Sequence, residues 1–112
     1  MKKNNIVKKN YEFNSILNTG EKIKNKYFII YYKKNNLDKY RFGISVGKKI
    51  GNAVYRNKYK RRIRNIIDNN KKYYKKNLDY IIILRKACLE IDFSNLEQNF
   101  IFLIKKINQK EK

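Results

Sequence analysis

The chain of 112 residues is long enough for one hydrophobic core and too short for two, so we expect a single domain over residues 1–112. Its 29 Lys and Arg residues against 9 Asp and Glu residues give a formal charge of +20, which predicts a polyanionic partner, most simply nucleic acid. The chain has no histidine and one cysteine, Cys88, which excludes Ser-His-Asp and Cys-His catalysis, an intrachain disulfide and a zinc site.

The first twenty residues predict a basic arm followed by a short helix. Residues 1–9 are basic and polar, so we expect a flexible arm, and they lead into no apolar signal core. Asn10 can cap a helix in which Phe13, Ile16 and Leu17 share one side, and a glycine follows to end it. The simplest role of that apolar side is packing on the core.

Two segments rich in aromatic and β-branched residues predict strands. They cover residues 26–33 and 40–46, with a polar turn at 35–38, so we expect a hairpin. In the first strand the odd-numbered residues, among them Tyr31, share one face and the even-numbered residues share the other. One face must cover the core, so the other face could present tyrosines to a ligand.

The long helix that follows carries a basic face. Its entry at residues 47–51 is basic and contains glycine, Asn52 is the expected N-cap, and the helix should run to about Tyr74. Four of the six arginines fall within residues 51–64. A guanidinium can hold a phosphate through two hydrogen bonds, so this clustering favours phosphate binding. Helical spacing predicts a basic row of Arg56, Lys60 and Arg64, with Asn57 and Arg61 beside it, and a core-facing apolar stripe of Tyr55, Tyr59, Ile63, Ile66 and Ile67.

Other charges in this region have simpler interpretations. Arg62 lies near the apolar stripe, so we expect its stem to run along the edge of the core. We interpret Lys71, Lys72, Lys75 and Lys76 as a solvated basic surface that assists binding without specificity.

The last third of the chain predicts a buried strand and a final helix. Residues 79–85 are almost continuously apolar, which is typical of a central strand. No apolar run approaches the ~20 residues of a membrane span, so we expect a cytoplasmic protein with no membrane partner. Ser94 to Glu97 form a capping box, residues 108–112 should be a flexible tail, and the buried side should hold Leu96, Phe100, Leu103, Ile104 and Ile107. The order helix, strand, strand, long helix, strand, helix predicts an α+β sandwich.

Residues 48–64 closely resemble the Arg-Asn-Arg signature of the bacterial ribonuclease P protein subunit, with Lys58 in place of the second arginine. The resemblance extends to residues 8–13, 41–46 and 79–83 and fades only at the termini and in residues 86–95. It implies a single-domain α/β sandwich whose long helix enters a crossover of the rare left-handed kind. Sequence physics alone would predict the right-handed crossover.

The resemblance also implies a function. In this family the protein binds a catalytic RNA, and that RNA removes the 5′ leader of precursor tRNA with Mg²⁺. The protein would thus be an accessory subunit of an endoribonuclease, with no catalytic residue, no tightly bound cofactor and no small-molecule substrate. The implied contacts with the catalytic RNA are Lys48, Lys49, Asn52, Arg56, Asn57, Lys58, Lys60, Arg61 and Arg64. The implied leader cleft lies between the first helix and the sheet and contains Phe13, Leu17 and Tyr31, where Leu17 replaces the aromatic residue of some relatives.

Two other functions are alternatives. A small ribosomal protein that binds RNA structurally would share the charge and the fold class, but the signature separates the two. A metal-dependent nuclease acting alone needs clustered carboxylates, and the few acidic residues form no such motif.

Overall fold

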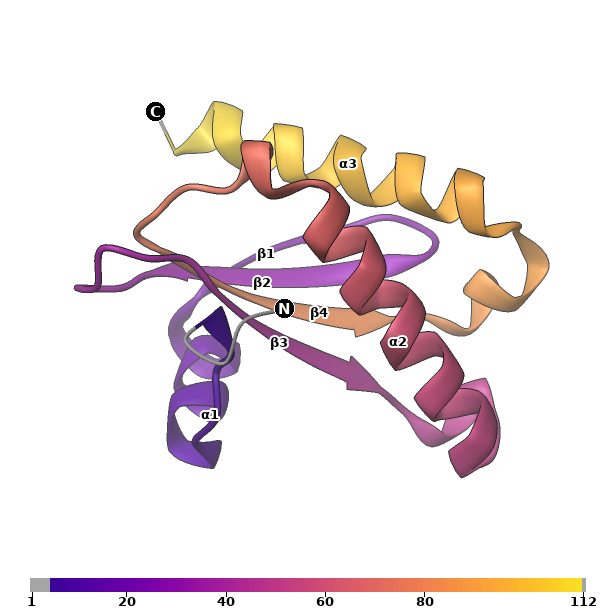
Figure 1. The fold of residues 1–112 in the computed structure, drawn as a ribbon. Coiled ribbons are helices and arrows are strands. Elements are labelled where there is room, and N and C mark those ends of the chain that lie inside the picture. Colours follow the sequence, from indigo (N-terminus) through magenta and orange to yellow (C-terminus); the bar gives the residue numbers. More distant parts are fainter. Residues whose placement is uncertain (1–4, 112) are drawn as a thin grey trace.

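One mixed sheet separates the helices into two layers. The computed structural model describes residues 5–111. Helix α1 lies on one face of a four-stranded sheet, and helices α2 and α3 lie on the other face (Figure 1), which confirms the predicted α+β sandwich. The elements are α1 (Asn10–Thr19), β1 (Glu21–Lys24), β2 (Phe28–Lys34), β3 (Arg41–Val46), η2 (Lys48–Ile50), α2 (Ala53–Asn69), η3 (Lys71–Tyr73), β4 (Leu78–Leu84), η4 (Lys86–Glu90) and α3 (Phe93–Lys110).

The strand order is β1-β2-β4-β3. The predicted hairpin between β2 and β3 is therefore wrong, because β4 lies between them, antiparallel to β2 and parallel to β3. β4 is apolar on both faces, so a central position buries it best. The edge strand β1, which we did not predict, pairs antiparallel with β2. Its Glu-Lys-Ile-Lys sequence holds a single apolar residue, Ile23, and so gives little strand signal.

Helix α2 connects the parallel strands β3 and β4. Their pairing places Ile44 opposite Ile82 and makes β3-α2-β4 a crossover unit. In Figure 1 both strands run to the right, β3 lies in front of β4, and α2 rises from beyond their arrowheads to the upper side of the sheet, next to α3. The path from β3 through α2 to β4 therefore turns with a left hand, as the family resemblance implies.

Alternation along the strands divides the apolar residues between two cores. Even-numbered residues of β2, β3 and β4 face α2 and α3 in the main core, which includes Phe42 and Tyr80. On the opposite face, Val7, Ile16 and Ile81 form a smaller buried cluster beneath α1. The prediction that alternate residues of a strand point to opposite faces of the sheet is confirmed. All five residues predicted for the buried side of α3 are buried.

Helix α2 is shorter than predicted. It ends at Asn69 and not near Tyr74. The chain then turns so that the Tyr74 side chain enters the main core, where its hydroxyl donates a hydrogen bond of 2.8 Å to the carbonyl of Ile67. Tyr74 therefore belongs to the main core although it lies beyond the end of α2.

The boundaries of α3 also differ from the prediction. Asp92, and not Ser94, caps the helix, since its Oδ1 accepts a hydrogen bond of 2.8 Å from the backbone N–H of Asn95. The helix continues to Lys110 and includes the first part of residues 108–112, whose flexibility stays a prediction. No helix within residues 5–111 is long and apolar enough to cross a membrane.

The end of the predicted N-terminal arm contacts the sheet. Val7 is buried, and its N–H donates a hydrogen bond of 2.9 Å to the carbonyl of Phe42 on the open edge of β3. Helix α1 begins at Asn10 with Lys9 in the N-cap position, one residue before the predicted cap. Residues 1–4 of the arm lie outside the described residues.

Candidate nucleic-acid interface

The start of α2 and its buried side set the direction of its basic residues. Asn52 caps the helix as predicted, because its Oδ1 accepts hydrogen bonds from the backbone N–H groups of Val54 at 3.1 Å and Tyr55 at 3.2 Å. Four members of the predicted apolar stripe, from Tyr59 to Ile67, are buried. Their burial turns the remaining faces of the helix outward. Tyr55 is the exception, since 53% of it is exposed, so its predicted place in the core is wrong.

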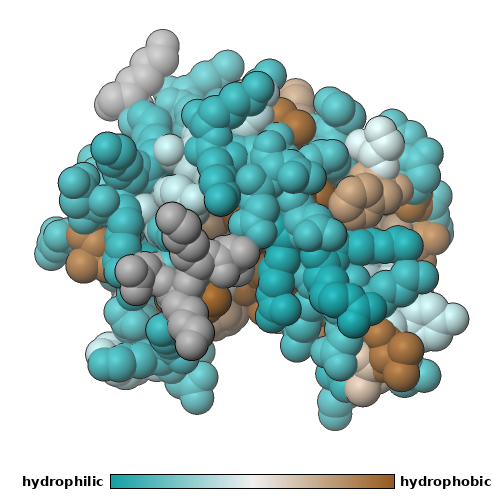
Figure 2. Space-filling view, in the orientation of Figure 1, coloured by the Kyte–Doolittle hydropathy of each residue, from teal (hydrophilic) through white to brown (hydrophobic). Residues whose placement is uncertain are grey.

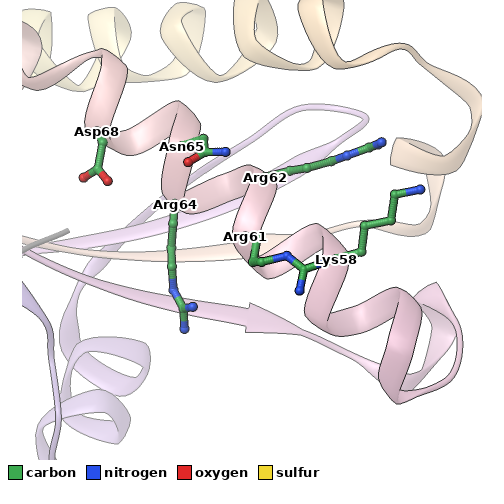
Figure 3. A pocket seen from close by; sticks show the side chains of 6 residues that line it. All are labelled: Lys58, Arg61, Arg62, Arg64, Asn65 and Asp68. Carbon is green, nitrogen blue, oxygen red and sulfur yellow. The ribbon is translucent and has the colours of Figure 1, made fainter.

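A shallow hollow of about 440 Å³ follows the outward face of α2 (Figure 3). In Figure 3 the Arg64 side chain points toward β3, whereas Lys58 and Arg62 point to the opposite side of the helix. The Arg62 guanidinium lies 5.4 Å from the ring centre of Tyr59, along the core edge as predicted. Figure 2 shows that hydrophilic residues dominate the surface over α2. The hollow is lined by Lys58, Arg61, Arg62, Arg64, Asn65 and Asp68.

The residues predicted to contact RNA do not form one flat row. Arg56 and Lys60 are half-buried, and the Arg56 Nε is buried without a hydrogen-bond partner among the described residues. Arg56 and Lys60 are therefore less accessible to RNA than the other residues of the set. The most accessible members are Lys48, Lys49, Asn52, Asn57, Lys58, Arg61 and Arg64, which are all exposed.

The three residues predicted for the leader cleft lie on the opposite face of the sheet. Phe13 and Leu17 on α1 and Tyr31 on β2 are half-buried and surround the small cluster beneath α1. Gly43 allows this close packing, because a Cβ atom there would lie 2.8 Å from Cε2 of Phe13 and 2.7 Å from Cδ1 of Ile81. The structure thus brings together all three residues that were assigned to the cleft.

The basic face of α2 and Phe13 of the predicted cleft meet at the open edge of β3. A hollow of about 180 Å³ is shared by Phe13 from α1, Ile44 from β3, and Lys60 and Arg64 from α2. The two predicted sites are therefore neighbours, although they lie on opposite faces of the sheet. Lys60 and Arg64, which α2 contributes to this hollow, form the border between the two predicted sites.

A third hollow, of about 730 Å³, was not predicted. Its lining includes Ile29 and Ile83, which lie on the same sheet face as Tyr31, and basic residues surround it. At 1.5 Å per residue, a helix as short as α1 covers only part of this sheet face. The third hollow could have been predicted from the sequence, by combining the alternation of the strand residues with the short length expected for α1. The basic residues that line the third hollow are Lys26, Lys48, Lys49, Arg85 and Lys86.

A buried ionic network holds α1 on the sheet. Arg41 Nε and Nη2 donate hydrogen bonds of 2.9 and 2.7 Å to the two carboxylate oxygens of Asp79, and Nη1 donates one of 3.0 Å to Glu12. Hydrogen bonding to Asp79, followed by that to Glu12, raises the pKa of Arg41 against the opposing effect of burial. Arg41 lies on β3, Asp79 on β4 and Glu12 on α1, so the network joins residues that are distant in the sequence.

Cys88 lies in the main core and is not a reactive thiol. Cys88 is buried, and burial raises the pKa of its thiol to about 11, so it stays protonated at neutral pH. Across residues 5–111, no group of three or more His, Cys, Asp or Glu side chains is placed to hold a metal ion. What the geometry offers is a positively charged face on α2 and a group of apolar and aromatic side chains beneath α1.

These features define a small, strongly basic α+β protein with a nucleic-acid-binding surface. The comparisons with known proteins give its family: the chain belongs to the ribonuclease P protein family, whose model matches residues 1–108. The ribonuclease P protein component of Mycoplasma mycoides is 48% identical over 108 residues, which cover 96% of this chain and 99% of the relative. That of Streptococcus pneumoniae is 39% identical over 105 residues, with 94% and 85% covered.

Solved structures agree with this assignment. A mutant of the Staphylococcus aureus RNase P protein superposes with a TM-score of 0.87 at 34% identity, covering 95% of this chain and 90% of that one. The RNase P protein of Thermotoga maritima gives a TM-score of 0.79 at 34% identity, with 85% and 90% covered. The alternative of a small ribosomal protein has no support among these relatives.

Proposed function

We propose that this chain binds the catalytic RNA of ribonuclease P through α2 and holds the 5′ leader of precursor tRNA in the cleft beneath α1. The RNA, in this proposal, cleaves the leader to generate the mature tRNA 5′ end. The observation that carries the proposal is the hollow at the edge of β3, where Lys60 and Arg64 lie beside Phe13. A single RNA assembly could therefore contact the basic face and the cleft together.

The α2 face suits a folded RNA. Lys58, Arg61 and Arg64 are exposed along it, and the flanking Lys48 and Lys49 are exposed in η2. Arginine holds phosphate oxygens through a planar fork, and lysine adds positive charge without a fixed geometry. Phosphate contacts of this kind position a protein on RNA, while the shape of the RNA supplies the selectivity.

The cleft suits a single-stranded leader. Phe13 and Tyr31 offer aromatic surface, and Leu17 offers apolar contact in the same group. A base that stacks on an aromatic side chain gains about 1–3 kcal/mol whatever its identity, so such a cleft tolerates leaders of different sequence. The basic hollow around Ile29 and Ile83 continues the same sheet face and extends the path available to the leader.

Metal ions belong to the RNA in this proposal. We assign the Mg²⁺ ions to the RNA because Mg²⁺ keeps several waters and is bound mainly through phosphate oxygens, which the RNA supplies in large number. Mg²⁺ bound by the RNA would activate the attacking water and stabilise the leaving oxygen. The location of the proposed partners, precursor tRNA and its processing RNA, makes the cytoplasm the expected compartment.

Reconstitution tests the proposal. We expect the protein to stimulate leader cleavage strongly when it is added to ribonuclease P RNA at low Mg²⁺ concentration, and to cleave nothing without that RNA. Arg61→Ala should weaken binding to the catalytic RNA, whereas Phe13→Ala should mainly weaken binding of leader-bearing substrate to the holoenzyme. Equal binding losses for mature tRNA and precursor tRNA in both variants would contradict the two-surface arrangement.

A further inference from the structure

Val54 and Tyr55 form an exposed apolar pair at the start of α2. Val54 is 75% exposed and Tyr55 is 53% exposed, although both lie in the first turn of a helix that is otherwise amphipathic. Figure 1 shows that this turn extends past the arrowheads of β3 and β4, so the sheet does not cover it. The pair therefore has no place in either core.

The apolar pair lies at one end of the basic face. Lys58 follows Val54 by four positions and Arg61 follows it by seven, so the three side chains share one side of the helix. No acidic residue occurs in the sequence between Asp38 and Asp68. In Figure 2 a small hydrophobic group lies at the lower right, where Figure 1 places the start of α2, next to hydrophilic surface.

The small size of this apolar pair and the positive charge around it indicate which kind of partner can bind there. Protein interfaces of ordinary size need about 800 Å² from each partner, far more than two side chains present. A second copy of this chain would also place like charges opposite one another, which opposes association. An unpaired RNA base fits better, because its flat face can stack on a tyrosine ring while neighbouring phosphates contact the basic residues.

We propose that Tyr55 stacks on an unpaired base of the catalytic RNA and that Val54 packs against the same nucleotide. The inference rests on the proposed binding of that RNA by α2 and adds a contact that does not depend on charge. Because Gly51 has a φ of 146° and a Cβ atom there would lie 3.1 Å from the Cβ of Tyr55, the backbone passes close to the tyrosine. One side of the tyrosine therefore lies against the Gly51 backbone, and the exposed remainder of the side chain is available to a base.

Binding of ribonuclease P RNA, measured over a series of salt concentrations, tests the proposal. Tyr55→Ala should weaken binding roughly 5- to 150-fold at every salt concentration, the range expected for the loss of one stack, with an unchanged log–log salt slope. Tyr55→Phe should bind like the unaltered protein, because it keeps the ring. Lys58→Ala should instead reduce the magnitude of the slope by about 0.7–0.9, as expected for one lost phosphate contact.

Phe102→Ala is the matched control. Phe102 is also 53% exposed, but it lies on α3, so its loss should leave RNA binding unchanged. Thermal unfolding of each variant checks that the fold is kept. The inference is overturned if Tyr55→Ala binds as tightly as the unaltered protein, if it lowers the salt slope, or if sedimentation shows that it dissociates a protein dimer. Failure of the proposed function is distinct, since Lys58→Ala and Arg61→Ala would then be silent as well.

Discussion

Gly43 is the residue at which the smallest change should disturb the leader cleft. Gly43→Ala would place a methyl group within 2.8 Å of both the Phe13 ring and the buried Ile81. Overpacking of this kind costs about 1–3 kcal/mol, and the half-buried Phe13 is the neighbour that can move. We expect a lower free energy of unfolding in chemical denaturation, together with weaker binding of precursor tRNA by the reconstituted holoenzyme.

Gly47→Ala provides the comparison. A Cβ atom at Gly47 meets nothing within 4 Å, and the φ of −79° suits alanine. This substitution should therefore be neutral or stabilise the protein by about 0.4–1 kcal/mol, through a less flexible unfolded chain. If the two alanine variants behave alike in both measurements, the close packing at Gly43 is not what shapes the cleft.

At the scale of the helices, the position of α1 depends on Arg41. Arg41→Met would leave Asp79, whose side chain is 7% exposed, without its charge partner. An uncompensated buried charge typically costs about 3–5 kcal/mol, so we expect a loss of that size in the free energy of unfolding. Glu12→Gln should cost less, because Asp79 still neutralises the guanidinium and the Glu12 side chain is 28% exposed. Denaturant titration of both variants measures the difference.

An exposed ion pair of the same chain is the control for this prediction. Lys26 and Glu90 approach to 4.0 Å, with side chains 68% and 74% exposed. Such pairs contribute about 0–1 kcal/mol, so Lys26→Met should change stability little. A loss for Arg41→Met no larger than that for Lys26→Met would show that the network does not hold α1 on the sheet.

Local patterns predicted the helices and strands better than their arrangement. Burial of alternate residues in β2 and of one side of α3 follows from periodicity within a few residues, so the sequence predicts it. The position of β4 between β2 and β3 depends on pairing across the whole chain, which periodicity does not encode. Periodicity also failed in one place. Helical spacing puts Tyr55 on the same side as the core residues, but the residue is exposed because the sheet does not extend far enough to cover the first turn of α2.

In the candidate site, too, local features could be predicted from the sequence and features that depend on tertiary packing could not. The basic face of α2 could be predicted from clustered arginine and helical spacing, because both are local. The grouping of Phe13, Leu17 and Tyr31 was implied only by the family resemblance, since it needs the packing of α1 on β2. The network of Arg41 with Asp79 could not be predicted, because its residues come from separate strands. The third hollow was missed because finding it needs the length of α1 as well as the alternation of the strands.

At the scale of the whole molecule, a formal charge of +20 raises the question of which charges act by contact and which by their field. Lys71, Lys72 and Lys76 are exposed beyond the end of α2 and do not line the hollow that contains Lys58, Arg61 and Arg64. Distant charges attract RNA through the electrostatic potential and mainly raise the association rate. Charges that contact phosphates also slow dissociation, since those contacts must break before the RNA leaves.

Two triple variants separate these roles. Replacing Lys71, Lys72 and Lys76 by alanine should slow association with ribonuclease P RNA at low salt. The difference should shrink toward physiological ionic strength, where the Debye length is about 8 Å. Replacing Lys58, Arg61 and Arg64 by alanine removes the same charge, but should also speed dissociation and reduce the magnitude of the log–log salt slope by about 2–3. Stopped-flow measurement of both rate constants over a salt series distinguishes them, and identical profiles would mean that the α2 face acts only through its field.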